Sequence, residues 1–232
     1  MPTHILVTGA SRGIGAATVA ALAASGARVV GHATRDAPGI IGADLAEPGA
    51  GDRLWGAALD RLDGRIDVLV NNAGVFEGVA IDSPDWAHVW ERSWRINLQA
   101  AADLCRNAVL HFGERGGRVV NVASRAAYRG DSPDHWHYAA AKAGMVGMTK
   151  SIARGYAARG ILAFSVAPGF TMTGMAEDYL ASRGGDILLA DIPLGRVATA
   201  DEVAETVRWL ALDAPPSLTG ACLDINGASY VR

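Results

Sequence analysis

Tyr138 and Lys142, four residues apart, are the pair in this sequence best suited to proton chemistry. The segment around them is rich in alanine and favours a helix, so both side chains are expected on one helix face, one turn apart. A phenol ordinarily titrates near ~10, and a cation fixed beside it stabilises the phenolate and lowers its pKa. Tyr138 is therefore a candidate general acid or base, but the same spacing occurs in ordinary helices, so the interpretation depends on the rest of the chain.

Composition and charge indicate a globular chain with no affinity for nucleic acid. The chain has 232 residues, of which 50% are hydrophobic and 19% charged, which suits one large α/β domain. Its net charge of -3 gives no electrostatic reason to expect nucleic acid or an anionic membrane as a partner. Cys105 and Cys222 form no metal or redox motif and are expected to be buried free thiols.

The sequence predicts neither a signal peptide nor a membrane-spanning segment. The first residues lead directly into an apolar strand, so the sequence predicts no signal peptide. No apolar run reaches the ~18 residues that a membrane span requires. We therefore expect a cytoplasmic protein.

A strand, a glycine-rich turn and a helix follow one another at the N-terminus. The apolar run 4–8 ends at Gly9, and the turn 10–15 leads into a helical pattern up to Ala24. Glycines in such a turn let backbone amides approach a pyrophosphate and let the helix pack closely on the strand. The turn predicts a dinucleotide site with these contacts: Gly9, Ser11, Arg12, Gly13, Ile14 and Gly15.

The end of the second strand, at 28–33, indicates which dinucleotide binds. It lacks the acidic residue that holds a ribose 2′-hydroxyl in NAD enzymes. Arg12 and Arg35 instead suit a 2′-phosphate, so NADP is the predicted cofactor and NAD the alternative, although Arg35 can equally be solvated. A third strand at 39–43 follows with no room for a helix. It ends at Asp44, which suits an adenine amino group or a turn cap.

The remaining pattern alternates helices and strands. Helices are expected at 51–62, from Asp85 (with Ser83 as cap and Pro84 at the first position) to Phe112, at 138–159 and at 200–210, where Thr199 and Glu202 form a capping box. Strands are expected at 66–70, 118–123, 161–167 and 222–225. This order predicts an α/β fold: a single-domain Rossmann fold over 1–232, with a seven-stranded, mainly parallel, doubly wound sheet and helices on both faces.

Three further features have two interpretations each. Trp86, Trp90 and Trp94 recur every four residues and form a stripe that suits core or subunit packing better than a cofactor box. His135 and His137 precede the tyrosine, but they lack acidic or cysteine partners at ligand spacing, so substrate contact is favoured and no metal is expected. The stretch 174–196 has no firm periodicity and suits a flap over the site.

Taken together, these motifs resemble the short-chain dehydrogenase/reductase family over nearly the whole chain. The resemblance rests, in order, on Thr8 to Gly15, Asn71-Asn72-Ala73-Gly74, Asn97, Ser124, Tyr138 to Lys142 and Pro168-Gly169. The segments 218–220 and 226–227 are most similar to the 3-oxoacyl-carrier-protein-reductase branch. The resemblance implies a catalytic tetrad of Asn97, Ser124, Tyr138 and Lys142, and a homotetramer or dimer.

The resemblance also implies a role for each of these residues. Hydride passes between the nicotinamide and a substrate carbon while Tyr138 exchanges a proton with the substrate oxygen, to which Ser124 donates a hydrogen bond. Lys142 lowers the pKa of Tyr138 and holds the nicotinamide ribose, and Asn97 positions a water that connects Lys142 to solvent. Besides the glycine turn, the implied cofactor contacts are Thr34, Arg35, Asp44, Leu45, Asn71, Ala73, Gly74, Tyr138, Lys142, Pro168, Gly169, Thr171 and Thr173.

The substrate is predicted from the charges around the tyrosine. An acidic carrier protein would favour a basic entrance, but here acidic residues accompany the arginines. The residues in question are Arg125, Arg129, Asp131, Asp134, Glu177, Asp178, Asp186 and Asp191. We therefore predict a small free carbonyl compound or cyclic alcohol, contacted by Ser124, Trp136 and Tyr138, with His135 or His137 as a hydrogen-bond partner. Trp136 can equally pack the loop against the helix.

Alternatives within and outside the enzyme class stay open at this point. They are a 3-oxoacyl-carrier-protein reductase, an NAD-dependent dihydrodiol or alcohol dehydrogenase, and a non-catalytic dinucleotide sensor on the same fold. The sensor is disfavoured because Ser124, Tyr138 and Lys142 are all present.

Overall fold

Seven parallel strands form one sheet in the computed structural model, which describes residues 2–172 and 185–232, with the backbone only at 186–188. The strands are β1 (His4–Val7), β2 (Arg28–Ala33), β3 (Ile40–Gly42), β4 (Val68–Asn71), β5 (Gly117–Val122), β6 (Ile161–Pro168) and β9 (Cys222–Ile225). They lie in the order β3-β2-β1-β4-β5-β6-β9, and all neighbours are parallel. This confirms the doubly wound sheet, whose order reverses between β1 and β4, where such folds bind ligands.

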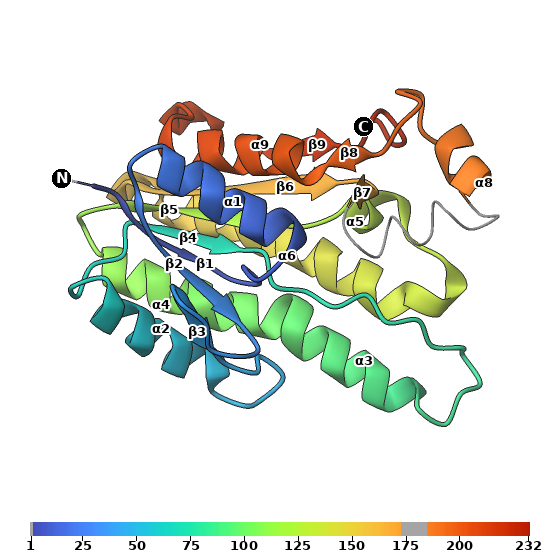
Figure 1. The fold of residues 1–232 in the computed structure, drawn as a ribbon, viewed down its shortest axis with the longest axis horizontal. Helices are drawn as coiled ribbons and strands as arrows, with labels where there is room; N and C mark the ends of the chain where they lie inside the picture. Colours follow the sequence, from blue (N-terminus) through green and yellow to red (C-terminus); the bar gives the residue numbers. More distant parts are fainter. Residues whose placement is uncertain (1, 173–184) are drawn as a thin grey trace.

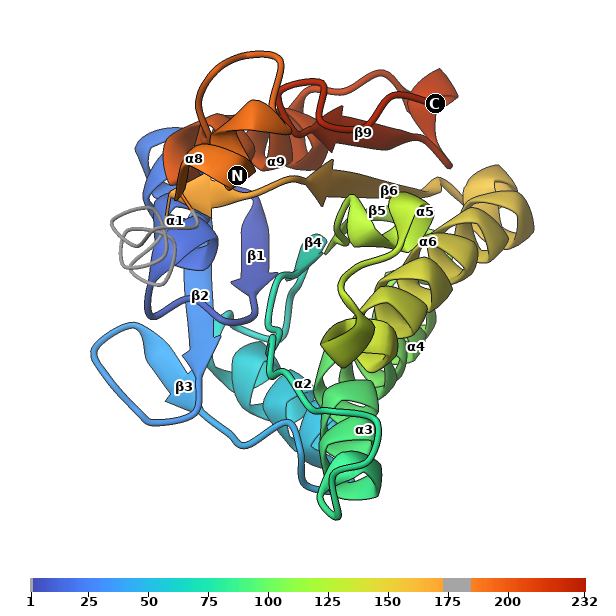
Figure 2. The ribbon, with the colours of Figure 1, turned by 90° about the vertical axis from the view of Figure 1, so that its right-hand side faces the viewer.

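Helices cover both faces of this sheet (Figures 1 and 2). Side chains of a strand alternate between the faces, so Leu6 packs in one core and its neighbours Ile5 and Val7 in the other. The first core is closed by α2 (Ala50–Arg61), α4 (Ala100–Phe112) and α6 (Trp136–Tyr156). The second is closed by α1 (Gly13–Ala24) and α9 (Ala200–Leu212), which lie against each other. Two buried cores therefore hold the strand ends in fixed positions.

Helix ends follow the expected capping chemistry at α9 and differ from it at α3 (Trp86–Trp94). At α9 the Thr199 hydroxyl accepts from the Glu202 amide at 3.2 Å, and the Glu202 carboxylate accepts from the Thr199 amide at 2.8 Å. The sequence placed the start of α3 too early. Its N-cap is Asp85, without a side-chain cap, because Ser83 instead accepts from the Asp85 amide at 3.2 Å and closes a turn before the helix.

Strands β2 and β3 are joined without a helix, as the sequence predicts. Parallel neighbours usually need a crossover of a dozen or more residues. Here the parallel ladder is only three pairs long, from Gly31 and Ile40 to Ala33 and Gly42, so a short loop returns the chain to its start. The carboxylate of Asp36 accepts from the Gly42 amide at 2.9 Å and fixes this loop. Asp36 is the first acidic residue after β2, and this bond occupies its carboxylate.

The C-terminal third adds short elements around the sheet edge. They are α5 (Ala126–Arg129), the two-stranded sheet of β7 (Thr171–Met172) and β8 (Ala198–Thr199), and α8 (Gly185–Ala190). Much of the predicted flap at 174–196, with Thr173, Glu177, Asp178 and the Asp186 side chain, lies outside the described residues. Within the described part of the chain, no helix has the length and apolar character that crossing a membrane requires.

Candidate functional site

The glycine turn between β1 and α1 is packed so tightly that side chains are excluded. Gly9 has a φ of +66°, and a Cβ there would lie 2.8 Å from Ala73 Cα. A Cβ at Gly15 would lie 2.0 Å from the Gly9 carbonyl oxygen. The Asn72 side chain donates to the carbonyls of Thr8 and Gly9, both at 3.0 Å. The turn is thus locked against the loop after β4, and its backbone faces an open cleft.

This cleft has a volume of about 770 Å³ and lies at the carboxyl ends of β1, β2 and β4. Many predicted cofactor contacts line it: Gly9, Ser11, Arg12, Gly13, Ile14, Gly15, Thr34, Asp44, Leu45, Ala73 and Gly74. Further lining residues were not predicted: His32, Ala33, Ala43, Asn72, Val75, Glu77, Arg92 and Ile96. A cradle of glycines beside a cleft of this size fits a dinucleotide, because backbone amides can approach its phosphates.

Asn71 and Arg35 were predicted as cofactor contacts, but neither lines the cleft. Asn71 is buried, and its side chain donates to the Asn121 side chain at 2.9 Å, inside the core rather than in the cleft. Its neighbour Asn72 makes the contacts to the glycine turn instead. Arg35 is exposed and does not line the cleft, whereas Arg12 does. Of the two arginines, only Arg12 is placed to meet a ligand in the cleft.

His32, at the end of β2, is a site residue that sequence reasoning missed. It is 3% exposed, its Nδ1 accepts from the Gly9 amide at 3.3 Å, and its Nε2 lies 3.0 Å from the Ala43 carbonyl. Nδ1 is thus an acceptor and Nε2 the donor, so the ring is neutral. Burial has the largest effect on the pKa of His32 and lowers it, whereas the hydrogen bond to the Ala43 carbonyl and the charge of Asp44 act to raise it. His32 therefore ties the glycine turn to the end of β3.

Lys142 and Asn97 meet at one end of this cleft. A Cβ on Gly74, which lines the cleft, would lie 2.8 Å from Asn97 Oδ1 and 3.6 Å from Lys142 Nζ. Lys142 is 3% exposed and donates to the Val122 carbonyl at 2.8 Å. Burial lowers the pKa of its ammonium to about 8. A basic nitrogen that titrates near neutrality therefore lies beside the predicted nicotinamide end of the cleft.

Tyr138 and Ser124 are also brought together, but the predicted effect of Lys142 on the tyrosine is wrong for the structure as it stands. Burial raises the pKa of Tyr138 to about 12, although a hydrogen bond with the Ser124 side chain acts to lower it. Lys142 Nζ lies 5.7 Å from the centre of the phenol ring and is turned to the Val122 carbonyl. Desolvation of the phenolate is therefore the dominant effect on this pKa, and the charge of Asp131 acts in the same direction.

Asn97 lies in a π-helical turn, Arg95–Gln99, between α3 and α4. Such turns insert an extra residue into a helix and are frequent at functional sites. The Asn97 side chain is fully buried, accepts from the Val75 amide at 2.9 Å and donates to the Val75 carbonyl at 3.0 Å. This explains an amide in the middle of a helical sequence, because it holds the loop that follows Gly74.

The residues before Tyr138 are arranged differently from the prediction. His137 is buried and turned to Ser93, so it is not a substrate contact. His135 stacks on Phe76, with ring centroids 3.8 Å apart, and Phe76 also meets Tyr138 edge-on at 4.8 Å. Trp136 is 50% exposed. Phe76, which sequence reasoning missed, follows the 71–74 loop by two residues and is the aromatic wall nearest to the tyrosine.

The tryptophan stripe forms a ladder on α3. Trp86 and Trp90 stack with ring centroids 5.2 Å apart, and Trp90 and Trp94 at 6.5 Å. Trp94 is 38% exposed, so the ladder is not part of either core. Its members pack on one another and leave an apolar edge at the surface.

The segment after β6 touches the loop that carries Ser124. The Arg125 amide donates to the Pro168 carbonyl at 2.9 Å, and the buried Thr171 donates its hydroxyl to the Gly169 carbonyl at 3.3 Å. A Cβ on Gly169 would lie 2.9 Å from the Asn226 Cβ. These contacts place the segment 168–171 beside Ser124, outside the cleft described above.

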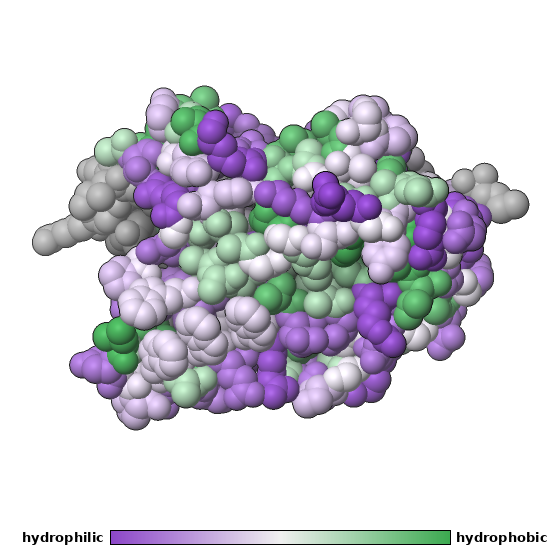
Figure 3. All heavy atoms as spheres, turned by 180° about the vertical axis from the view of Figure 1, so that it is seen from behind, coloured by the Kyte–Doolittle hydropathy of each residue, from purple (hydrophilic) through white to green (hydrophobic). Residues whose placement is uncertain are grey.

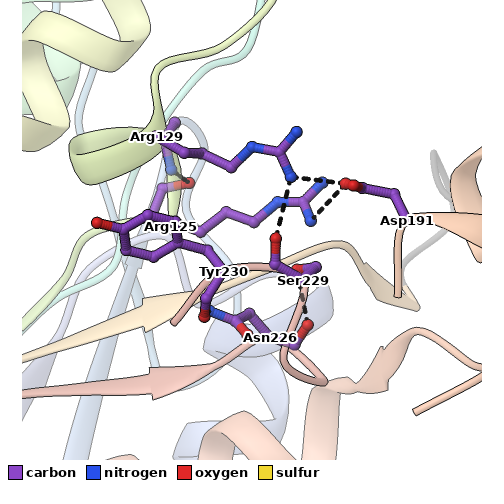
Figure 4. Close-up of polar contacts among 8 residues, drawn as sticks. Arg125, Arg129, Asp191, Asn226, Ser229 and Tyr230 are labelled. Atoms are coloured by element: carbon purple, nitrogen blue, oxygen red, sulfur yellow. Dashed lines mark hydrogen bonds and ion pairs between the residues drawn. The ribbon is translucent and has the colours of Figure 1, made fainter. Parts of the chain in front are cut away.

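Two arginines next to this segment share one carboxylate (Figure 4). Asp191, directly after α8, accepts from Arg129 at 2.6 Å and from Arg125 at 3.4 Å. Arg129 also donates to the Ser229 carbonyl at 3.2 Å. The arginines lower the pKa of Asp191, which stays ionised. The rim of the site is therefore an ion cluster in which two arginines share one carboxylate.

Comparisons with known proteins agree with this geometry. Residues 9–228 match the model of a family described as Enoyl-(Acyl carrier protein) reductase. A 3-oxoacyl-[acyl-carrier-protein] reductase of Synechocystis sp. is 38% identical over 96% of this chain and 94% of its own length. The FabG reductase of Vibrio cholerae is 36% identical over 97% of this chain and 96% of its own.

The chain belongs to the short-chain dehydrogenase/reductase family. Two solved structures of similar fold match nearly all of it. A blue fluorescent protein from a metagenomic library, in complex with NADPH, has a TM-score of 0.89 and 31% identity and covers 99% of this chain and 98% of its own. A provisionally assigned 2-deoxy-d-gluconate 3-dehydrogenase from Agrobacterium tumefaciens, with bound NADP, has a TM-score of 0.88 and 30% identity, covering 99% and 97%.

The family assignment makes the protein an oxidoreductase that acts on carbonyl or CH–OH groups. The matched family description names an enoyl reductase, whereas the curated relatives above are 3-oxoacyl reductases. The comparisons therefore agree on the family and differ on the substrate. Among the described residues, no group of three or more His, Cys, Asp or Glu is placed to hold a metal ion.

Proposed function

We propose that this protein is an NADP(H)-dependent carbonyl reductase or alcohol dehydrogenase that uses Tyr138 as its general acid and base. The observation that carries the proposal is the meeting of Lys142 and Asn97 against Gly74, at the end of a cleft lined by a glycine turn. Ser124 and Tyr138 are hydrogen-bonded beside it. A dinucleotide cleft that ends at a phenol, a hydroxyl and a buried ammonium suits hydride transfer coupled to proton transfer.

NADP is the proposed cofactor, with NAD as the alternative. Arg12 lines the cleft, and no acidic residue ends β2. Asp36, the first acidic residue after β2, accepts from the Gly42 amide and does not line the cleft. An arginine side chain pairs better with a 2′-phosphate than with the free 2′-hydroxyl of a ribose. The two similar structures above contain NADPH and NADP, which supports this choice.

Each polar group of the site has a distinct task in the proposed reaction. The bound cofactor supplies or accepts the hydride. Tyr138 holds a proton at its hydroxyl and donates it to the substrate oxygen during reduction, and Ser124 donates a hydrogen bond to the same oxygen. Lys142, with a pKa of about 8, returns a proton towards the tyrosine, and Asn97 holds the loop after Gly74 in place.

The proposed substrate is a small free carbonyl compound or cyclic alcohol. Arg125 and Arg129 share Asp191, and Asp131 lies close enough to act on Arg125, so the rim offers an acidic carrier protein little net positive charge. Phe76 is 43% exposed beside Tyr138 and supplies an apolar wall for a compact substrate. Trp136, the first residue of α6, is half exposed and is the second proposed apolar contact.

A second candidate is a 3-oxoacyl-carrier-protein reductase. It is favoured by the curated relatives, which are 34–38% identical across nearly their whole length. Both candidates use the same proposed residues for proton and hydride transfer, so only the substrate separates them.

A substrate comparison tests the proposal. NADPH oxidation is followed with an acetoacetyl group on a carrier protein, with the same group as a small free ester, and with cyclic ketones. We expect the highest kcat/KM for a free carbonyl compound. A much higher kcat/KM for the carrier-bound group would overturn the small-substrate proposal and establish the second candidate.

We also propose that the protein is a homodimer or homotetramer in the cytoplasm. Figure 3 looks onto the face where α4 and α6 lie side by side and shows weakly apolar residues across its middle. Leu110 on α4 is 65% exposed, and Trp94 adds the edge of the tryptophan ladder. Sedimentation equilibrium gives the assembly directly, and a monomer at micromolar concentration would contradict the proposal.

A further inference from the structure

A buried hydrogen-bond chain joins Asn97 to the residue before Tyr138. Asn97 Nδ2 donates to Ser93 Oγ at 2.9 Å, and Ser93 Oγ lies 2.9 Å from His137 Nδ1. Ser93 and Asn97 are fully buried, and His137 is 1% exposed. Three polar side chains are thus withdrawn from water between α3 and α6, and each needs its partners to offset the cost of burial.

The orientation of Asn97 fixes the direction of the first hydrogen bond in this chain. The Val75 amide donates to Asn97 Oδ1, so the other end of that side chain is the donor. Ser93 Oγ receives that donor, and its own single proton is then free to point to His137 Nδ1. A chain that runs one way, from Asn97 through Ser93 to His137, requires a neutral imidazole with its proton on Nε2.

The rest of the His137 environment agrees with a neutral ring. Its Nε2 has no partner with hydrogen-bond geometry in the part of the chain that the structure describes. The backbone carbonyls of Glu77 and Asp134 are close enough to raise its pKa, but burial and the neighbouring His135 lower it. The Trp90 ring packs edge-on against the imidazole, with centroids 6.4 Å apart.

The position of the chain connects it to the site. Ser93 is on α3, one turn before Asn97 in the π-helical turn, and His137 is on α6, next to Tyr138. Asn97 touches both main-chain polar atoms of Val75 and lies against Gly74, where Lys142 Nζ also lies. A rotated Asn97 amide would release this loop at the end of the cleft.

We propose that Ser93 and His137 are positioning residues for the reaction, which hold the Asn97 amide in the orientation that fixes the 74–75 loop beside Lys142. This proposal rests on the proposed function of the site. It deepens that function by adding two residues that touch neither cofactor nor substrate. A simple tie between two helices would also use this bond, so the test must separate orientation from packing.

Activity measurements use His137→Leu, which removes the acceptor at similar size, and His137→Asn, whose side-chain oxygen replaces Nδ1 as acceptor. Ser93→Ala removes the relay. We expect Ser93→Ala and His137→Leu each to lower kcat for the best ketone about tenfold, as for one lost buried hydrogen bond, with KM for NADPH within about twofold. His137→Asn should retain kcat within about threefold.

The double variant Ser93→Ala/His137→Leu distinguishes a chain from two packing effects. Residues of one chain are not independent, so its kcat should match that of the single variants rather than the product of their losses. Additive losses, or single variants with parental kcat, would overturn the proposal. If His137→Leu does not fold, the comparison of Ser93→Ala with His137→Asn is still decisive, because only Ser93→Ala removes the hydrogen-bond link between Asn97 and His137.

A readout without turnover keeps this test separate from the proposed function. ¹⁵N spectra of histidine-labelled protein at neutral pH report the tautomer of His137, with its signal assigned by loss in His137→Asn. We expect the proton on Nε2 and an Nδ1 shift typical of an acceptor, and a changed Nδ1 shift in Ser93→Ala. A ring protonated on Nδ1 would refute the chain even if the enzyme is active. A correct tautomer in an enzyme whose Tyr138→Phe variant is fully active would refute the proposed function alone.

Discussion

Lys142 and Tyr138 share a helix face but do not share a proton in this structure: Lys142 Nζ lies 5.7 Å from the centre of the phenol ring and donates to the Val122 carbonyl at 2.8 Å. Burial acts on both groups and in both cases favours the neutral form, raising the pKa of Tyr138 to about 12 and lowering that of Lys142 to about 8. The spacing on the helix thus brings the two groups close together without lowering the pKa of the phenol.

The burial of Lys142 predicts a cost in stability. With a pKa of about 8 in the folded protein and 10.5 as its ordinary value, the ammonium costs on the order of 3 kcal/mol below pH 8, and nothing above 10.5, where neither state is charged. Lys142→Met should therefore abolish turnover and yet raise the melting temperature at pH 7, by roughly 4–8 °C once about 1 kcal/mol is subtracted for the bond to Val122. Lys150→Met, at an exposed position of the same helix, is the control. A melting temperature below that of the parent would contradict the cost.

Arg12 and Arg35 form a matched pair for the cofactor preference. The sequence predicts that both arginines meet a 2′-phosphate, but only Arg12 lines the cleft. Arg12→Ala should weaken NADPH binding roughly 10–100-fold and leave NADH binding nearly unchanged, because a charged hydrogen bond to a 2′-phosphate is lost. Arg35→Ala should change neither by more than about threefold. Dissociation constants from fluorescence titration decide this, and an unchanged preference in Arg12→Ala would refute the role.

Acidification should weaken both the fold and the cleft through His32. Its pKa is lowered by burial in the folded protein, so below its ordinary value of about 6.5 the unfolded chain binds a proton that the folded chain does not. Stability is therefore full above pH 6.5 and falls as the pH drops below it, and the Gly9 amide loses its acceptor when the ring is protonated. Urea unfolding at pH 7.5 and 5.5, with NADPH titration at each pH, checks this. A free energy of unfolding that rises on acidification would exclude it.

His111 and His137, whose pKa values are also lowered by burial, add to the same loss of stability at low pH, so His32→Asn should remove only part of it.

Asp191 contributes a negative charge to the rim, so its removal should change the preference for charged substrates. Asp191→Asn leaves Arg125 and Arg129 without their shared carboxylate. We expect kcat/KM to rise several-fold for substrates that carry a negative charge near the carbonyl, and to stay within about twofold for neutral ketones. The gain should vanish at high salt if the arginines act through their charge. An equal change for charged and neutral ketones would show that Asp191 acts on the fold of the rim instead.

The fold and the polar groups at strand ends could be predicted because their signals are local. The glycine turn after β1, the hydroxyl of Ser124 after β5 and the four-residue spacing of Tyr138 and Lys142 are each read from adjacent residues. The missing helix between β2 and β3 was also predictable, because the six residues 34–39 leave no room for it.

The contacts that sequence reasoning missed join residues far apart in the chain. Gly9 and His32 are 23 residues apart, Ser93 and His137 are 44, and Arg129 and Asp191 are 62. No periodicity or spacing predicts such partners, since they depend on which helices lie beside which strands. The prediction of a lowered pKa for Tyr138 was wrong for the same reason: the spacing predicts a neighbouring cation, but burial depends on the assembled site.

The most direct test of the account is the turnover of Tyr138→Phe. The variant keeps the ring that meets Phe76 and removes only the hydroxyl, so the fold and the cleft should be retained. We expect NADPH binding within about twofold of the parent and kcat for the best ketone lower by ~10²–10⁴-fold, the usual contribution of general acid–base catalysis. Binding is measured by titration and turnover by NADPH oxidation on the same preparation. Unchanged binding with kcat within a few-fold of the parent would contradict the central claim that Tyr138 transfers the proton.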